Sequence, residues 1–159
     1  MKYHLGLGTN LGRTIRNLDK TVFLLIKKGI EIQKMSSIYK TEPVGLADQP
    51  CFINQVVEAE SDLAPREMLE AIKGIEKIMK RRQAVRNGPR IIDIDILLAE
   101  DAVVRTEDLV IPHPRLADRN FVLVPLAEIA PDVVHPILKK SMKELARLSR
   151  DRSRVQKIR

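Results

Sequence analysis

The chain has 159 residues, of which 44% are hydrophobic and 31% charged. This length and balance suit one globular domain with a substantial core. The absence of any apolar run near 18 residues argues against a membrane span. The single cysteine, Cys51, excludes an internal disulfide and a cysteine-based zinc cluster. The first residues have the pattern of a strand and not of a signal peptide, so we expect a cytoplasmic protein.

The net charge of +7 is concentrated at one end of the chain. Residues 139–159 hold nine Lys or Arg and two acids, whereas residues 1–138 hold 19 of each and are neutral. A like-charged end is usually a solvated or frayed terminus, and weak contact with a nucleic acid or another polyanion is the alternative. We therefore expect a basic tail that is solvated or frayed, and no nucleic-acid partner. A monomer is compatible with this sequence.

Strand and helix periodicities alternate along the first hundred residues. In chain order they predict a strand at 2–8, a helix at about 13–28, strands at 30–40 and 51–61, a helix opening near 65, and a strand at 88–98. Gly29 is suited to ending the first helix, and Pro65 suits the first turn of the second. Short helices are expected near 121–129 and 140–149.

The order β-α-β-β-α-β predicts an α+β fold: a ferredoxin-like sheet with both helices on one face and extra C-terminal helices. Neither a repeat nor a linker interrupts the pattern, so we expect a single domain. It would comprise residues 1–138 and continue into the basic helix and tail at 139–159.

Two carboxylates lie in the apolar strand at 88–98. Side chains alternate faces along a strand, so Asp93 and Asp95 share one face, while Ile92, Ile94, Ile96 and Leu98 share the other. At about 3.3 Å per residue the two carboxylates start roughly 7 Å apart. Burying such a pair is costly without a cation. Arg90 offers a salt bridge to Asp93, but a hard divalent cation shared with a phosphate-bearing substrate fits the pair better.

A basic loop leads into this strand. Residues 80–90 contain five cations and no acid: Lys80, Arg81, Arg82, Arg86 and Arg90. Such a loop is often only solvated, but arginines beside a two-carboxylate metal site are what phosphoryl transfer requires. The glycine-rich segment at 6–12 lacks the pattern of a phosphate-binding loop, which favours a tight strand-to-helix turn.

Three further side chains are candidates for ligand binding. Phe52 and Asn54 share a face of one strand, and together they can stack on and hydrogen-bond a flat heterocycle. Structural roles in the core are the alternative. His113, between Pro112 and Pro114, is suited to donating a hydrogen bond to phosphate, with an ordinary surface loop as the alternative.

The combination of these segments resembles the 6-hydroxymethyl-7,8-dihydropterin pyrophosphokinase family of the folate pathway, in order from residue 3 to about 136. The segments that carry the resemblance are Gly8 through Gly12, Tyr39 through Pro43, Gln49 through Asn54, Glu76, Arg86 through Arg90, Asp93-Ile94-Asp95, Pro112-His113, Arg119 with Phe121, and Pro125 through Pro131. The Gly-Pro-Arg-x-x-Asp-x-Asp run is the most specific of them.

The resemblance implies that residues 1–138 are a pyrophosphokinase domain with a ferredoxin-like core. It would transfer the terminal pyrophosphate of ATP to the reduced pterin and release AMP. Two Mg²⁺ ions would bind Asp93 and Asp95. The implied pterin contacts are Thr41, Pro43, Leu46, Phe52, Asn54 and Phe121. The implied ATP contacts are Glu76, Arg90, His113 and Arg119, and Arg81 and Arg90 would assist transfer.

Three positions depart from the family pattern. Gln83 stands where the family has a second arginine, with Arg82 one residue away. Phe52 replaces a tyrosine of some members, and Thr9 replaces a common serine. None of these changes affects the expected metal ligands.

Two other functions are compatible with parts of the sequence. A basic ferredoxin-like RNA-binding module would stack bases on sheet aromatics, but aromatic residues are only 3% of the chain. A different Mg²⁺-dependent nucleotidyl or phosphoryl transferase is the second. Release of AMP and not ADP from ATP would separate the pyrophosphokinase from both.

Overall fold

The computed structural model describes residues 1–43, 48–79 and 88–159. Within them, six strands form one antiparallel sheet in the order β5-β1-β4-β3-β8, and β2 also pairs with β4. Their bounds are β1 (Lys2–Thr9), β2 (Glu31–Met35), β3 (Tyr39–Thr41), β4 (Phe52–Glu60), β5 (Asp93–Ala99) and β8 (Val155–Lys157). A separate hairpin joins β6 (Val104–Arg105) to β7 (Val110–Ile111).

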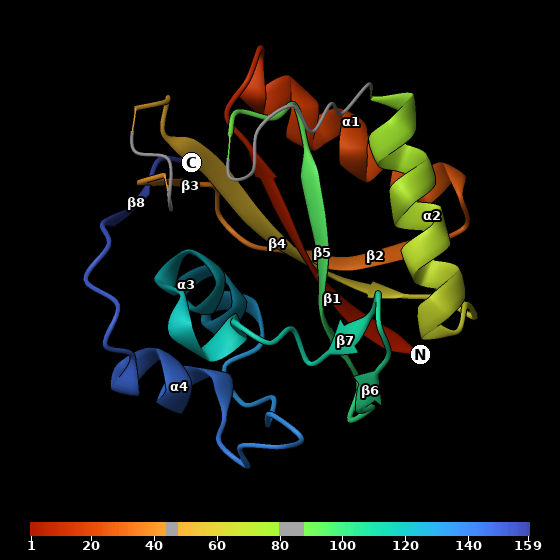
Figure 1. The fold of residues 1–159 in the computed structure, drawn as a ribbon, viewed down its shortest axis with the longest axis vertical. Coiled ribbons are helices and arrows are strands. Elements are labelled where there is room, and N and C mark those ends of the chain that lie inside the picture. Colours follow the sequence, from red (N-terminus) through yellow and green to blue (C-terminus); the bar gives the residue numbers. More distant parts are fainter. Residues whose placement is uncertain (44–47, 80–87) are drawn as a thin grey trace.

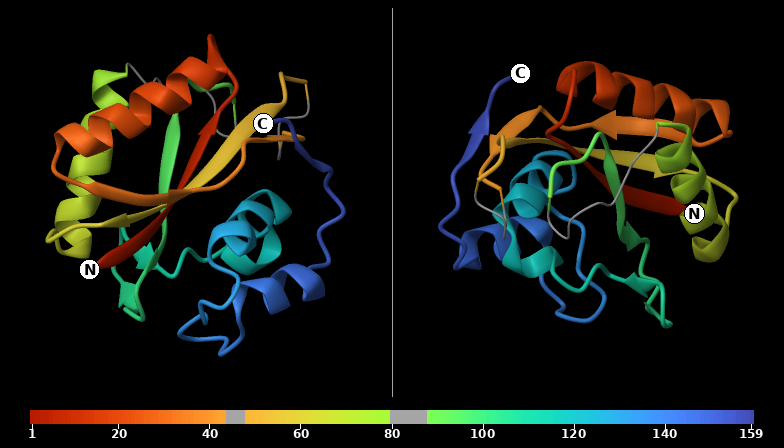
Figure 2. Two further views of the ribbon diagram at one scale, coloured as in Figure 1. Left: turned by 180° about the vertical axis from the view of Figure 1, so that it is seen from behind. Right: turned by 45° about the horizontal axis from the view of Figure 1, so that its top comes forward.

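Helices cover both faces of the sheet (Figures 1 and 2). Helices α1 (Thr14–Lys27) and α2 (Pro65–Ile78) cover one face, where a core cluster includes Leu5, Leu18 and Ile72. On the other face, α3 (Asn120–Ile129) and α4 (Met142–Leu148) pack over a second cluster that includes Leu97 and Leu123. In the described part of the chain, no helix is long and apolar enough to cross a membrane.

The strand predicted at 30–40 is broken into β2 and β3. Ser36 leaves the strand path, and its hydroxyl accepts a hydrogen bond from the backbone of Val56 at 2.9 Å. Glu128 of α3 accepts hydrogen bonds from the backbone N–H and the hydroxyl of Ser37, at 2.9 and 2.6 Å. These side-chain hydrogen bonds replace regular backbone pairing between strands, and those from Ser37 attach the break to α3.

The aspartate strand is shorter than predicted, because β5 begins at Asp93 and not at residue 88. The prediction that Leu98 shares a face with Ile94 and Ile96 is wrong. The register with β1 shifts between His4 and Leu5, so one extra residue of β5 bulges out. Such a bulge changes the face of every later residue. Leu98 accordingly packs in the cluster under α3 and not with Ile96.

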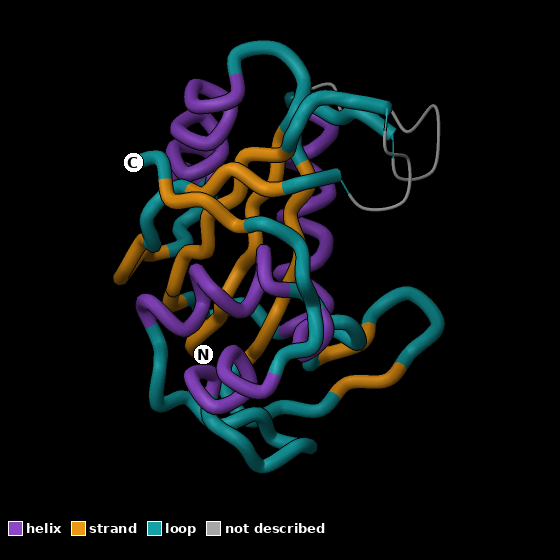
Figure 3. The backbone as a smooth tube through the Cα atoms, turned by 90° about the vertical axis from the view of Figure 1, so that its left-hand side faces the viewer, coloured by secondary structure: helices purple, strands orange, loops and turns teal. Residues whose placement is uncertain are grey.

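The charged side chains of the basic tail are exposed, but its end is not frayed. Strand β8 pairs with β3, and Ile38 exchanges backbone hydrogen bonds with Ile158 and Arg159 at 2.9 Å. Figure 3 shows the C-terminus returning to the sheet. Unpaired edge groups of β3 favour this addition, while the charged ends remain outside: Arg152, Arg154 and Lys157 are exposed.

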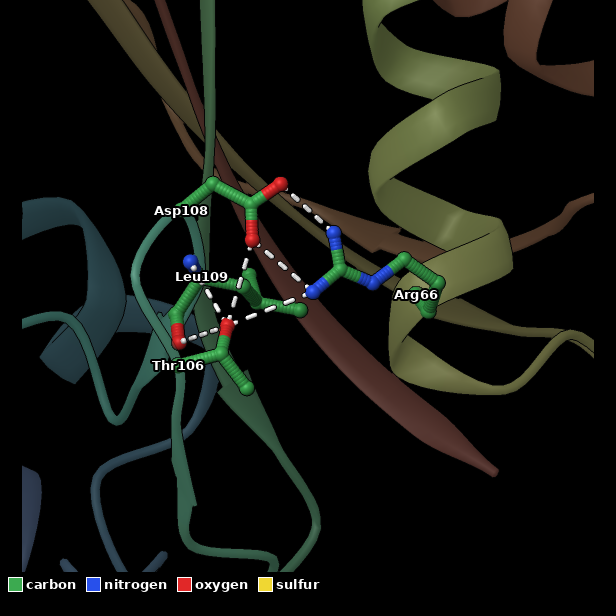
Figure 4. Close-up of polar contacts among 4 residues, drawn as sticks. All are labelled: Arg66, Thr106, Asp108 and Leu109. Carbon is green, nitrogen blue, oxygen red and sulfur yellow. Dashed lines mark hydrogen bonds and ion pairs between the residues drawn. The ribbon is translucent and has the colours of Figure 1, made fainter.

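An exposed ion pair ties α2 to the turn between β6 and β7 (Figure 4). Arg66 donates to both carboxylate oxygens of Asp108, at 2.6 and 2.8 Å, and to Thr106 at 3.3 Å. The hydrogen bonds from Arg66 lower the pKa of Asp108 to about 2. The contact anchors the hairpin just before the cis peptide bond between Ile111 and Pro112, which leads into His113.

Candidate active site

A cavity lies between α3 and the central strands β1, β4 and β5. It encloses about 740 Å³, including open solvent at its mouth. Eight of the predicted site residues line it: Thr41, Phe52, Asn54, Arg90, Asp93, Asp95, Arg119 and Phe121.

The two aspartates line this cavity beside glycines of the neighbouring strand. In the pairing of β1 with β5, Gly8 is opposite Asp93 and Gly6 is opposite Asp95. Glycine has no side chain, so the sheet surface next to each carboxylate stays open. Gly6 and Gly8 lie within β1, in agreement with the strand predicted at 2–8, and Gly12, with φ of +76°, lies in the turn before α1.

Gly8 also leaves room for Asn54. A Cβ atom at Gly8 would lie 2.8 Å from Asn54 Oδ1, which is closer than real Cβ contacts come. Asn54 is buried, and its amide donates a hydrogen bond to Thr41 Oγ1 at 2.6 Å. The hydroxyl thereby fixes the amide orientation and leaves Oδ1 as the acceptor on the glycine side.

Two arginines face the carboxylates. Arg90 Nη1 lies 3.2 Å from Asp93 Oδ2, so the salt bridge considered as the alternative to a cation is present. Arg119 is half-buried, and burial, with Arg115 nearby, lowers its pKa, while Asp95 and Asp93 oppose that shift. The Arg119 guanidinium also lies 5.5 Å from the centroid of the Phe121 ring. Positive and aromatic groups therefore share one wall of the cavity.

His113 lies close enough to Arg119 and Asp93 for both to influence its pKa. Burial lowers the pKa first, and Arg119 lowers it further, so the imidazole is neutral at pH 7. Its Nδ1 accepts a hydrogen bond from the backbone of Arg115 at 3.1 Å. The proton of the neutral ring is then on Nε2, which is free to act as a donor.

The remaining predicted site residues are not among the described residues that line the cavity. Glu76 of α2 accepts a hydrogen bond from the backbone N–H of Ile94 at 3.1 Å, so it contacts β5 but does not line the cavity. Pro43 follows Glu42, which lines the cavity. The predictions for Leu46 and Arg81, and those for Arg82, Gln83 and the rest of the loop at 80–87, lie outside the described residues.

Asn10, which is 3% exposed, was not among the predicted site residues. Its side-chain amide donates to Gln49 Oε1 and to the Pro50 carbonyl, both at 2.9 Å, and its Oδ1 accepts from the backbone of Arg90. Asn10 thus joins the end of β1 to the segments before β4 and β5. Its place in the Gly-Thr-Asn-Leu-Gly run was the available signal.

Paired carboxylates facing arginines in a cavity with two aromatic rings are the arrangement expected of a phosphoryl transferase that binds a flat substrate. The family model of 7,8-dihydro-6-hydroxymethylpterin-pyrophosphokinase matches residues 4–131. The chain belongs to this family.

Individual relatives agree with this assignment. A 2-amino-4-hydroxy-6-hydroxymethyldihydropteridine pyrophosphokinase of Aquifex aeolicus is 44% identical over 141 residues, covering 89% of this chain and 88% of the relative. The Bacillus subtilis protein of the same name is 44% identical over 131 residues, 82% of this chain and 78% of the relative. The chain spans only 18% of another relative, the folic acid synthesis protein fol1 of Pneumocystis carinii, to which it is 38% identical.

Solved structures share the fold. A Plasmodium falciparum HPPK-DHPS structure with pterin and p-hydroxybenzoate matches with a TM-score of 0.74 and 20% identity, over 92% of this chain and 43% of that one. At this identity the likeness supports the α+β fold alone.

Proposed function

We propose that the cavity between α3 and the sheet is where this chain carries out its reaction, the transfer of pyrophosphate from ATP to 6-hydroxymethyl-7,8-dihydropterin in folate biosynthesis. The single observation that carries the proposal is the joint presence of Asp93, Asp95, Phe52 and Phe121 in the lining of one cavity. A metal and phosphate site would thereby adjoin a site for a flat ring.

We propose that the pterin ring stacks between Phe52 and Phe121, and that the Asn54 amide forms hydrogen bonds with the edge of the ring. The fixed orientation of Asn54 and the half-buried state of both rings support this role. Contacts from Thr41, Pro43 and Leu46 would complete the pterin site.

ATP would lie on the arginine side of the cavity. Arg90, Arg119 and the Nε2–H of His113 offer charge and hydrogen bonds to its phosphates, and Glu76 would complete the nucleotide contacts. Arginine pairs with phosphate through two parallel hydrogen bonds. Arg90 and Arg81 would stabilise the negative charge that develops during transfer.

Two Mg²⁺ ions are proposed to bind at Asp93 and Asp95. The described residues contain no group of three or more His, Cys, Asp or Glu side chains placed to hold a metal. Two carboxylates still suit Mg²⁺, because it usually keeps several waters and binds through one or two carboxylates plus substrate phosphates. When bound, it would supply charge neutralisation at the phosphate oxygens.

The protein's own contribution would be positioning. The pterin hydroxymethyl oxygen would attack the β-phosphorus in line, and the bond from that phosphorus to the α-phosphate oxygen would break, releasing AMP. Holding both substrates in this geometry accounts for much of the acceleration in such reactions.

We further propose that the core is ferredoxin-like. The strand order β5-β1-β4 followed by β2 and β3, all antiparallel, supports this assignment, as does the position of α1 and α2 on one face. Helices α3 and α4 and strand β8 would be additions to that core.

Alanine at Asp93 or Asp95 tests the site. Each variant, incubated with ATP, Mg²⁺ and the reduced pterin, should form no detectable AMP while retaining a wild-type circular dichroism spectrum. Asp132→Ala is the matched control, because the Asp132 side chain is 87% exposed and does not line the cavity. Near-wild-type AMP formation by either site variant would contradict the assignment. Absence of AMP from the wild type together with tight RNA binding would favour the RNA-binding alternative.

A further inference from the structure

The C-terminal segment at residues 150–157, here called the strap, bonds to the first residue of α3. Asp151 Oδ2 accepts a hydrogen bond from the backbone N–H of Asn120 at 2.8 Å. In return, the side-chain amide of Asn120 donates to the Asp151 carbonyl at 2.8 Å. The two residues are 31 positions apart in the sequence, so this is a tertiary contact. Asn120 lies between Arg119 and Phe121, both of which line the cavity.

This contact provides a cap that the helix itself does not supply. The N-cap position of α3 is Arg119, whose side chain makes no capping hydrogen bond. Arginine has donors but no acceptor, so it is unable to satisfy the free N–H groups at the start of a helix. Asp151 supplies the missing acceptor, and its negative charge suits the positive end of the helix dipole. Arg119 is thereby free to face the cavity.

The carboxylate of Asp151 is itself held in place. Its Oδ1 accepts a hydrogen bond from the backbone of Ser153 at 2.8 Å, and its own backbone N–H donates to Ser149 Oγ at 3.2 Å. Burial alone would raise its pKa, but the hydrogen bonds from Asn120 and Ser153 and the charge of Arg119 lower it. Asp151 is therefore ionised at neutral pH.

The other end of the strap reaches the opposite wall of the cavity. Val155 pairs with Thr41 in the β8–β3 ladder, and the backbone N–H of Arg154 donates to Glu42 Oε1 at 3.0 Å. Thr41 and Glu42 both line the cavity. One short segment is thus bonded to the wall that carries Phe121 and to the wall that carries Thr41. The strap itself lies beyond the residues matched by the family model, which end at 131.

We propose that Asp151 is a positioning residue for the reaction, acting through Asn120 to fix Arg119 and Phe121 relative to the pterin wall at Thr41. This inference rests on the substrate site proposed above. It assigns to the strap a role in substrate affinity, in addition to its contribution to the sheet edge.

The test compares Asp151→Ala and Asp151→Asn with the wild type in steady-state kinetics and in calorimetric binding of the pterin. Losing a helix cap of ordinary strength corresponds to about a fivefold change in an equilibrium constant. We expect Kd and KM for the pterin to rise by about that factor in Asp151→Ala, with a smaller rise in Asp151→Asn and a smaller change in kcat. Asp132→Asn, which also removes one negative charge near α4, should leave both constants unchanged.

A purely structural role would give a different result. It would lower the thermal midpoint and the active fraction, and hence kcat, without changing Kd or KM; that outcome would overturn the inference. If Asp151→Ala does not fold, Asp151→Asn carries the test, because it removes the negative charge at the start of α3 with little change in side-chain size. An unchanged Kd in that variant would overturn the inference.

A further variant separates the two hypotheses, the pterin site itself and the positioning role of Asp151. If Phe121→Ala binds pterin as tightly as the wild type does, the substrate site itself is wrong. If Phe121→Ala weakens binding while the Asp151 variants do not, only the positioning role is excluded.

Discussion

Asn10 and Arg90 exchange two hydrogen bonds between the end of β1 and the approach to β5. The backbone N–H of Asn10 donates to the Arg90 carbonyl at 3.2 Å, and the backbone N–H of Arg90 donates to Asn10 Oδ1 at 2.9 Å. The same Asn10 side chain donates to the carbonyl of Pro50 and to Gln49. Arg90 is therefore held where its guanidinium meets Asp93 by a residue that does not line the cavity.

Asn10→Asp should destabilise the protein, because the new carboxylate places an oxygen against Gln49 Oε1 and the Pro50 carbonyl. Two part-buried hydrogen bonds are lost, and the new carboxylate oxygen faces two acceptor oxygens, so we expect the free energy of unfolding to fall by about 1 to 3 kcal/mol. Urea unfolding measures this. Gln156→Glu, at an exposed amide of β8, is the control and should change little. Equal stability of the two variants would show that the Asn10 network contributes nothing.

Gly8→Ala should weaken pterin binding, because the added Cβ would lie 2.8 Å from Asn54 Oδ1 and must displace that amide. The matched control is Gly6→Ala on the same strand, whose Cβ would meet the Leu97 side chain at an ordinary 3.5 Å. Losing a well-placed hydrogen bond predicts a Kd for pterin that is raised about tenfold in Gly8→Ala. Calorimetry on both variants measures it. Equal effects of the two substitutions would argue against a role for Asn54.

Arg90→Ala should lower kcat far more than it weakens pterin binding. A guanidinium that stabilises charge developing on the transferred phosphates contributes in the transition state and little to the bound ground state. We expect a decrease in kcat of about a hundredfold or more, as for other electrostatic groups of this kind. Arg66→Ala, which breaks the exposed pair with Asp108 away from the cavity, is the control. A pure increase in KM would mean that Arg90 only binds substrate.

The stability of the protein should fall as pH decreases below about 6.5. His4 is 2% exposed and its Nε2 lies 2.9 Å from Glu58 Oε2. Burial lowers its pKa below 6.5, although the hydrogen bond to Glu58 opposes that shift, and burial also lowers the pKa of His113 and His135. Below 6.5 the unfolded chain therefore binds more protons than the folded one. The stability that comes from keeping these histidines neutral is fully present above pH 6.5 and declines as the pH falls below it.

Unfolding by urea at pH 7.5, 6.5 and 5.5 measures this decline. Each histidine that stays neutral in the folded state contributes a slope of up to about 1.4 kcal/mol per pH unit. His4→Gln should lower stability at pH 7.5 but flatten the decline between 6.5 and 5.5. A variant with the wild-type slope would exclude His4 as a source of the pH dependence.

Local sequence patterns predicted the order of the main elements and several residues that line the cavity. Helical spacing is visible within a few turns, so the bounds of α1 were predicted within a residue and the start of α2 was predicted at its observed position. Strand alternation is equally local, and it placed Asp93 and Asp95 together on one face, where they line the cavity. Phe52 and Asn54 were paired by the same rule.

Only the tertiary structure decided which distant segments complete the site. The bulge that moves Leu98 to the other face depends on the register with β1, and the break at 36–38 depends on Glu128. Asn10 accepts a hydrogen bond from Arg90, 80 residues away, and Asp151 accepts one from Asn120, 31 residues away. Neither contact has a periodicity that a sequence window could detect, because each joins backbone and side-chain groups that become neighbours only after the sheet and α3 have packed.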